Sequence, residues 1–469
     1  MILTMKKTNF SILMLFILAT IGSSCFAQGN ITARIDSLMR TANGRGIFNG
    51  NILVARNGKI LYSSALGSAQ ADKNKKLDQE MIFDIGSISK EFNGVAIMIL
   101  KERKLLSIED PITKFLPELP EWASKVKIRH LISYTSGIPI FDALAAETDS
   151  VIQKNLLSLK SLKFEPGTAY IYNHYNVYLQ MRIIERVSGL KYAEFINKNI
   201  LKPLKMKHSF VDYPTTAERM AKSYDSEMRP VNYAQGMSGW VRLNITDLYK
   251  WIEALDSYKI ISAESYRELA VNFAGGESSL GSTGFEGEQL LWHQHQGSNS
   301  NYEALLYHNL KDKLTIVMMT NNQQMKVHGL KSAIIAIAKN EPFIIPKKSV
   351  YLEVREKILN DIDKGIAYYN NLKAQQQESY DFSFEIGDLI STGKYLQRRA
   401  RYDDAIRIFT MAVKLDAKAT DVSYGYELMA ETYLKKGNKT DAITWYQKAI
   451  SVDNNNKNAK GMLETLLKN

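Results

Sequence analysis

The sequence changes character after Pro342 and Pro346, and this change constrains the fold more than any other feature. Residues 31–345 mix apolar runs, alternating segments and turn residues, which is typical of one large domain with both helices and strands. Residues 351–469 contain few Gly or Pro residues and follow a helical pattern almost throughout. A chain of 469 residues is also too long for one ordinary domain. We therefore expect a mixed domain followed by an all-helical one.

An internal repeat marks the helical part. Five positions have a counterpart 37 residues later: Asp404, Ala405, Ile406, Phe409 and Ala412 correspond to Asp441, Ala442, Ile443, Tyr446 and Ala449. Small and aromatic residues in fixed alternation allow two antiparallel helices to pack closely and to stack on the next pair. The pattern resembles tetratricopeptide repeats, and an unrelated pair of α-hairpins is the alternative.

The repeat sets the expected domain boundaries in the second half. We assign residues 381–469 to the tetratricopeptide-like repeats. Residues 346–380 are expected to form a helical linker or a degenerate earlier repeat, because Gly365, Tyr369 and Leu372 match part of the pattern.

The N-terminus has the composition of a secretory signal. Lys6 and Lys7 precede the apolar run Phe10–Ile21, and Cys25-Phe26-Ala27 resembles a cleavage site. We expect residues 1–27 to be removed, residues 28–345 to form the first domain, and the protein to be periplasmic or attached to the cell envelope. An uncleaved anchor is one alternative. A lipid anchor on Cys25 is another, although Gly22 stands where lipoprotein signals usually carry Leu.

Charge and cysteine content exclude several classes of function. The formal charge is +11, spread along the chain without a dense basic run, and an exported protein has little access to nucleic acid. We therefore expect no nucleic-acid partner. Cys25 is the only cysteine, so a chain cleaved after Ala27 has no disulfide or zinc-thiolate site.

Four Ser-x-x-Lys motifs occur, at Ser87, Ser124, Ser188 and Ser391, so the motif alone proves little. Only Ser87 follows a strand-like run and a glycine and opens a buried helical stretch, Ile88–Leu100. Backbone N–H groups at a helix N-terminus favour developing negative charge. Lys90 lies three residues on, on the same helix face, where its amine can activate the Ser87 hydroxyl. Ser87 is therefore the predicted nucleophile.

The residues around Ser87 carry a family resemblance that extends over about 300 residues. The segment Phe83–Lys90 is similar to the nucleophile segment of the β-lactamase-related serine hydrolases, which include class C β-lactamases, D-Ala-D-Ala carboxypeptidases, D-aminopeptidases and certain esterases. Further similar segments follow in family order: Ile128–Leu131, Thr135–Pro139, Pro166–Thr168, Tyr172, Pro203–Met206, Thr246–Leu248 and His295–Gly297. The resemblance implies an α/β (α+β) fold of the β-lactamase and penicillin-binding-protein type, with an antiparallel sheet flanked by helices.

The resemblance also implies roles for residues beyond the nucleophile. Tyr172 would shuttle a proton between Ser87 and the leaving group, with help from Lys90. The family motif is Tyr-x-Asn, whereas this chain has His174 in the third position, which affects substrate recognition more than the nucleophile. The alternative for Tyr172 is a packed aromatic residue in a tyrosine-rich stretch.

The third motif has the His-x-Gly form. By the resemblance, His295 and Gly297 would lie on a strand beside the site, and the N–H groups of Ser87 and Ser298 would form the oxyanion hole. Many β-lactamases carry Lys at the His295 position, so we favour an esterase or peptidase over an efficient β-lactamase. His293 and His295 could also be read as metal ligands, but no acidic residue or third His lies nearby in sequence, and we expect no metal site.

Two functions remain open from the sequence. The first is an exported serine hydrolase that acts through an acyl-enzyme on an ester, an amide or a peptidoglycan-like peptide, without a cofactor. The second is an inactive binding or scaffold protein that uses the hydrolase fold as a receptor. In either case the helical repeats offer a surface for a peptide or protein partner, and the alternative is a passive or dimerising appendage.

Overall fold

The structure, a computed structural model, describes residues 30–70, 75–141, 148–225, 228–231 and 236–468. The predicted signal peptide, its cleavage site and Cys25 lie outside the described residues. The chain divides into two compact units, residues 1–345 and 346–469. In the described parts of the chain, none of the helices has the length and apolar character that crossing a membrane requires.

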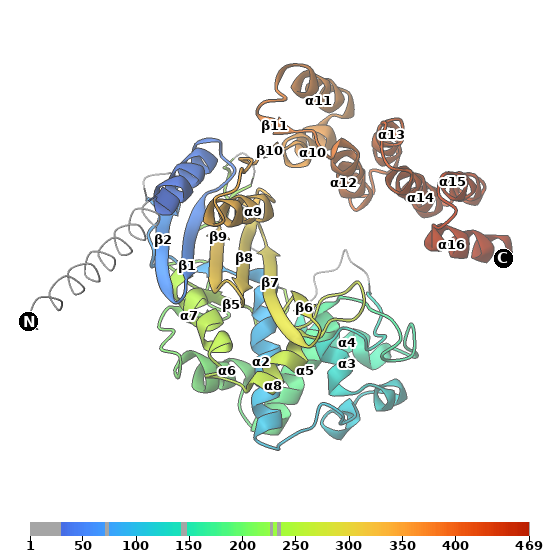
Figure 1. Cartoon of the computed structure of the whole chain (residues 1–469). Helices are drawn as coiled ribbons and strands as arrows, with labels where there is room; N and C mark the ends of the chain where they lie inside the picture. Colours follow the sequence, from blue (N-terminus) through green and yellow to red (C-terminus); the bar gives the residue numbers. More distant parts are fainter. Residues whose placement is uncertain (1–29, 71–74, 142–147, 226–227, 232–235, 469) are drawn as a thin grey trace, which may run out of the picture. The chain divides into compact units, whose positions relative to one another are not determined.

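A six-stranded antiparallel sheet forms the centre of the first unit, with the strand order β2-β1-β9-β8-β7-β6 (Figure 1). Its strands are β1 Gly50–Arg56, β2 Lys59–Leu66, β6 Ser282–Glu286, β7 Gln289–Asn299, β8 Tyr302–Asn309 and β9 Leu314–Thr320. The Asn57-Gly58 dipeptide forms the turn between β1 and β2, with positive φ at both residues, as is typical of Asn-Gly in tight hairpins. The chain pairs β1 with β9, so the hairpin at the start of the unit joins strands more than 250 residues later.

Side chains alternate between two apolar cores, one on each face of this sheet. On β1, Ile52 and Val54 belong to one core and Leu53 and Ala55 to the other. The helix over residues 30–44 and α9 (Val327–Ala338) cover the first face. The larger second core contains residues of these helices: α2 Ser89–Glu102, α3 Ile128–Ile132, α4 Asp149–Ser158, α5 His174–Ser188, α6 Tyr192–Ile196, α7 Ile245–Asp256 and α8 Ala263–Ala270.

A small antiparallel sheet includes residues just before Ser87. Its order is β3-β5-β4, with β3 at Phe83–Asp84, β5 at Val241–Leu243 and β4 at Ser209–Val211. The antiparallel sheet with flanking helices confirms the predicted fold class.

The second unit is almost entirely helical. After the short strand β10 (Lys348–Ser349) its elements are α10 Val350–Asn360, α11 Ile362–Gln375, β11 Tyr380–Asp381, α12 Glu385–Gln397, α13 Tyr402–Ala412, α14 Ala419–Lys435, α15 Lys439–Val452 and α16 Lys457–Lys468. Phe409 on α13 is fully buried, and a Cβ on Gly393 of α12 would lie 2.3 Å from its ring. Tyr446, its counterpart 37 residues later, is buried in one cluster with Ala430. Small residues thus face aromatic ones in both helix pairs, while the tetratricopeptide assignment stays a prediction.

Candidate active site

Ser87 lies on the turn that joins the small sheet to α2. β3 ends at Asp84, a 3-10 turn spans Gly86–Ile88, and α2 begins at Ser89. Gly86 has a φ of +52°, and a Cβ on it would lie 2.4 Å from the amide nitrogen of Ser298. Glycine alone suits both the dihedral angle and the close approach. The turn therefore holds a half-buried Ser87 at the start of a buried helix, beside the end of β7.

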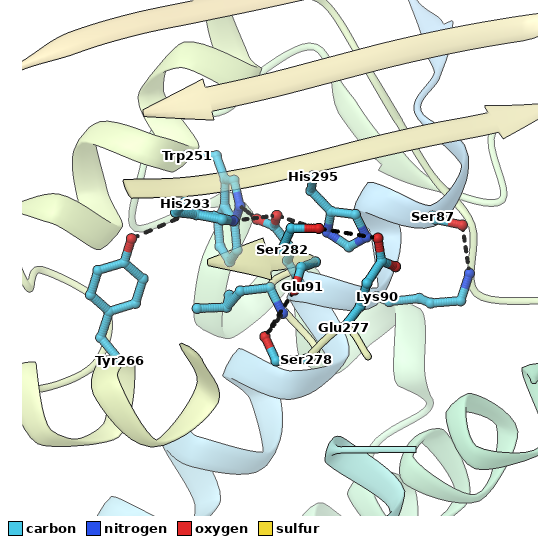
Figure 2. A network of polar contacts seen from close by, with 12 residues as sticks. Ser87, Lys90, Glu91, Trp251, Tyr266, Glu277, Ser278, Ser282, His293 and His295 are labelled. Atoms are coloured by element: carbon cyan, nitrogen blue, oxygen red, sulfur yellow. Dashed lines mark hydrogen bonds and ion pairs between the residues drawn. The ribbon is translucent and has the colours of Figure 1, made fainter. Parts of the chain in front are cut away.

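Two of the side chains named from the sequence meet the hydroxyl of Ser87. Lys90 Nζ donates a hydrogen bond to Ser87 Oγ over 2.9 Å, and the Tyr172 hydroxyl donates one over 2.8 Å. Figure 2 shows the Ser87–Lys90 contact. Lys90 is only 2% exposed, so its amine is held in place by packing. A serine with two such neighbours is the arrangement that nucleophilic catalysis requires.

Aromatic rings surround the amine of Lys90. Its Nζ lies 4.9 Å from the ring centroid of Tyr172 and 5.1 Å from that of Trp240, within the range of cation–π attraction. His174, the first residue of α5, packs edge-on against the same Trp240, with ring centroids 5.6 Å apart. Trp240 thus links His174 to the surroundings of Lys90, a role that the sequence did not indicate.

The ionisation of Tyr172 bears on its chemical role. Burial raises the pKa of its phenol well above 10, the hydrogen bond to Ser87 opposes this rise, and the negative charge of Glu277 adds to it. Tyr172 is therefore a neutral phenol near pH 7. A phenol in this state can relay a proton in a concerted step but does not act as a standing base.

The backbone at the end of β7 closely approaches the backbone of the turn that carries Ser87. A Cβ on Gly297 would lie 1.9 Å from the carbonyl oxygen of Ile85 and 2.7 Å from the amide nitrogen of Ser87. The amide of Ser298 lies beside Gly86, as described above. The amides of Ser87 and Ser298 therefore border the same small region, and any side chain at position 297 would push the strand away.

A buried ion pair between Asp84 and Arg242 holds the turn that carries Ser87. Asp84 accepts a hydrogen bond from the Gly86 amide over 2.8 Å and another from Arg242 Nε over 2.9 Å. The side chains of Asp84 and Arg242 are 0% and 1% exposed. Removal of either partner would leave a buried charge uncompensated beside Ser87. Arg242 lies 158 residues from Asp84, and no local sequence signal connects the two.

A second buried network contacts His295 (Figure 2). The carboxylate of Glu91 accepts hydrogen bonds from His293 Nε2 over 2.8 Å, from His295 Nδ1 over 2.9 Å and from Trp251 Nε1 over 2.7 Å. Glu91 and both histidine side chains are almost fully buried. Sequence reasoning found no acidic neighbour for these histidines because Glu91 precedes them by about 200 residues.

His293 and His295 are the two histidines whose spacing could also indicate metal ligands. Across the described ranges, no cluster of three or more His, Cys, Asp or Glu side chains is suited to hold a metal ion. His293 and His295 instead donate to Glu91.

The other Ser-x-x-Lys motifs lie in different surroundings. Ser188 is the last residue of α5, and Ser391 lies inside α12 of the second unit. Ser124 lies on the 3-10 turn Glu121–Lys125, where its hydroxyl donates to the carbonyl of Glu121. None of the three opens a buried helix as Ser87 does.

Comparison with known proteins identifies the family. The Beta-lactamase family model matches residues 33–339. The chain belongs to this family. The match covers most of the first unit, and the penicillin-binding-protein type of fold inferred from the motifs is thereby confirmed.

Among curated proteins, the chain is 26% identical over 362 residues to penicillin-binding protein 4* of Bacillus subtilis, a match covering 68% of this chain and 78% of that protein. It is 26% identical to protein flp of Staphylococcus aureus, over 61% of this chain and 62% of that protein.

Solved structures share the fold. An octameric penicillin-binding protein homologue from Pyrococcus abyssi has a TM-score of 0.58 and 22% identity, over 70% of this chain and 81% of that one. A D-amino acid amidase from Ochrobactrum anthropi SV3, solved with L-phenylalanine, has a TM-score of 0.55 and 19% identity, over 66% of this chain and 98% of that one.

Proposed function

We propose that the protein is an exported serine hydrolase that acts on an ester or an amide through a covalent acyl-enzyme. The observation that carries this proposal is the Ser87 hydroxyl, which lies within hydrogen-bond distance of both Lys90 and Tyr172 at the start of α2. Membership of the Beta-lactamase family supports it. The predicted signal at residues 1–27 is the basis for export.

The proposed reaction has two halves. Ser87 Oγ attacks the substrate carbonyl, its proton passes through Lys90 and Tyr172 to the leaving group, and the carbonyl–leaving-group bond breaks. The N–H groups of Ser87 and Ser298 stabilise the tetrahedral oxyanion. Water then attacks the acyl-enzyme carbonyl, its proton passes through the same pair to Ser87 Oγ, and the bond between Oγ and the acyl carbon breaks to release the acid and free Ser87.

An amide or ester is favoured over a β-lactam as the substrate. The third motif has His295 where many β-lactamases have Lys, and in this chain the ring is bound to Glu91. A neighbour with the same fold is a D-amino acid amidase, and relatives are penicillin-binding proteins, so amino acid amides and peptidoglycan-like peptides are the first substrates to test.

A fluorophosphonate probe tests the proposal directly. The probe should label the wild-type protein at Ser87, as peptide mass mapping would show, and Ser87→Ala should not be labelled. A panel of p-nitrophenyl esters, nitrocefin, D-Ala-D-Ala peptides and D-amino acid amides then identifies the substrate class. A folded wild-type protein without labelling or turnover would instead support the inactive scaffold.

A further inference from the structure

Glu91 is a buried charged residue that the proposed proton transfers do not use. It lies on α2, directly after Lys90 and four residues after Ser87, and it is 0% exposed. Residues four apart share a helix face, so Glu91 lies under the nucleophile turn and against β7. Its three hydrogen bonds come from Trp251, His293 and His295.

The ionisation of Glu91 determines which histidine nitrogens carry hydrogen. Burial alone would raise its pKa, but the charge and hydrogen bonds of His293 and His295 outweigh burial and lower the pKa to about 2. An ionised carboxylate only accepts hydrogen bonds. His293 must therefore be protonated on Nε2, and His295 on Nδ1.

The two histidines differ at their other ring nitrogen. His293 Nδ1 lies 3.4 Å from the hydroxyl of Tyr266, whose pKa burial raises well above 10, so that the phenol is a donor. His293 is thus engaged at both nitrogens. His295 Nε2 is buried, and no protein atom of the described residues hydrogen-bonds to it.

The free nitrogen of His295 faces the nucleophile side of the network. His295 and Gly297 are two residues apart on β7 and share a face, and Gly297 packs on the Ser87 amide. In Figure 2 the His295 ring lies between the Glu91 carboxylate and the Ser87–Lys90 pair. Gly281 leaves space for the ring, since a Cβ there would lie 2.7 Å from it.

We infer that Glu91 is a positioning residue: by holding Nδ1–H of His295, it presents Nε2 as an unprotonated acceptor for an N–H or O–H donor of the substrate. This inference rests on the proposed function and narrows its substrate class. The preferred acyl groups would carry such a donor next to the scissile carbonyl, as N-acylaminoacyl groups do. Charged and titratable groups around the ring are Glu91 and Lys90 from α2, His293 from β7, and Glu277 from the segment before β6.

The first test observes the tautomer and needs no substrate. In the full-length protein labelled with ¹⁵N-histidine, long-range ¹H–¹⁵N spectra at pH 8 should show His295, assigned with His295→Gln, as the Nδ1–H form. Glu91→Gln should release this form, because an amide nitrogen near the ring offers donors as well as an acceptor. A wild-type His295 protonated on Nε2 would overturn the inference, even if Glu91→Gln failed to fold.

The second test compares two esters with the same leaving group, N-acetylalanine p-nitrophenyl ester (both enantiomers) and p-nitrophenyl propionate. Only the first has an N–H beside the carbonyl. Glu91→Gln should lower kcat/KM about tenfold more for the N-acetylalanine ester, since one substrate hydrogen bond is worth roughly this factor. Equal losses for both esters would show that Glu91 has only a structural role.

Trp251→Phe is the matched control. It removes the hydrogen bond to the other carboxylate oxygen of Glu91 and keeps an aromatic ring stacked on Phe92, while His295 retains its contact. Any loss should be equal for the two esters. If wild type neither reacts with the fluorophosphonate nor hydrolyses either ester, the proposed function fails, and the spectra still decide whether Glu91 sets the tautomer of His295.

Discussion

Two buried carboxylates on opposite faces of the central sheet behave in opposite ways. Glu91 contacts the β7 face that packs on α2, and its pKa is lowered to about 2. Glu303 lies on β8 and turns to the other face, together with Gln296, and burial raises its pKa to about 7. Both are nearly inaccessible to water, so burial alone does not explain the difference.

The hydrogen-bond donors explain it. Glu91 accepts from two imidazoles, which can carry positive charge, and from an indole. Glu303 accepts from two neutral amides, the backbone N–H of Met325 over 3.1 Å and Gln296 Nε2 over 3.2 Å. Neutral donors lower the pKa less than the burial raises it. The face that Glu91 contacts therefore has a charged carboxylate near Ser87, whereas the carboxyl group of Glu303 on the other face is neutral below about pH 7.

The largest expected effect tests whether the chemistry lies on the Glu91 face. Ser87→Ala should lower turnover of any substrate found by at least about 10³-fold, because it removes the attacking atom. Ser188→Ala, in another Ser-x-x-Lys motif, should retain wild-type turnover. Equal activity of the two variants would show that Ser87 is not the attacking residue.

Glu91→Gln should destabilise the protein. The pKa of Glu91 falls from 4.5 to about 2 on folding, so its ionisation stabilises the folded state by about 3 kcal/mol above pH 4.5. This contribution is lost as the pH falls from 4.5 towards 2. Urea unfolding of wild type and variant should differ by about this amount at pH 7. A difference that did not shrink at pH 3 would contradict the assignment.

Glu303→Gln is the same substitution on the opposite face, and it should change the free energy of unfolding in the opposite direction. Folding raises the pKa of the Glu303 carboxyl from 4.5 to about 7, so the folded protein loses stability as the pH increases through this range and the carboxyl must ionise. The glutamine should therefore raise the free energy of unfolding at pH 8 by up to about 3 kcal/mol and change it little at pH 4. Melting temperatures at the two pH values would reveal a wrong sign.

The pH dependence of turnover sharpens the comparison further. If His295 Nε2 must be an acceptor, kcat/KM for the N-acetylalanine ester should be up to about tenfold lower in acid than at pH 8, because an imidazolium has no acceptor nitrogen. Glu303→Gln should leave this acid limb in place, since Glu303 contacts the other face. A flat profile between pH 5 and 8 would show that no histidine must be neutral.

Local patterns were sufficient for much of the fold. The change from a mixed to an all-helical part and the buried helix after Ser87 could be predicted from the sequence, because composition and side-chain periodicity depend on neighbouring residues. The two sheet faces could not be assigned this way, since β1 pairs with β9 across the whole unit.

The same division holds for the site. The sequence alone was enough to select Ser87 as the candidate nucleophile, with the lysine three residues later and the family order of Tyr172 and the His295 motif, because helix spacing and motif order are properties of the chain. Only the tertiary structure decided that Arg242 supports the turn and that Glu91 holds His295. A buried charge needs partners to offset the loss of water, and the chain can supply them from any distance in sequence.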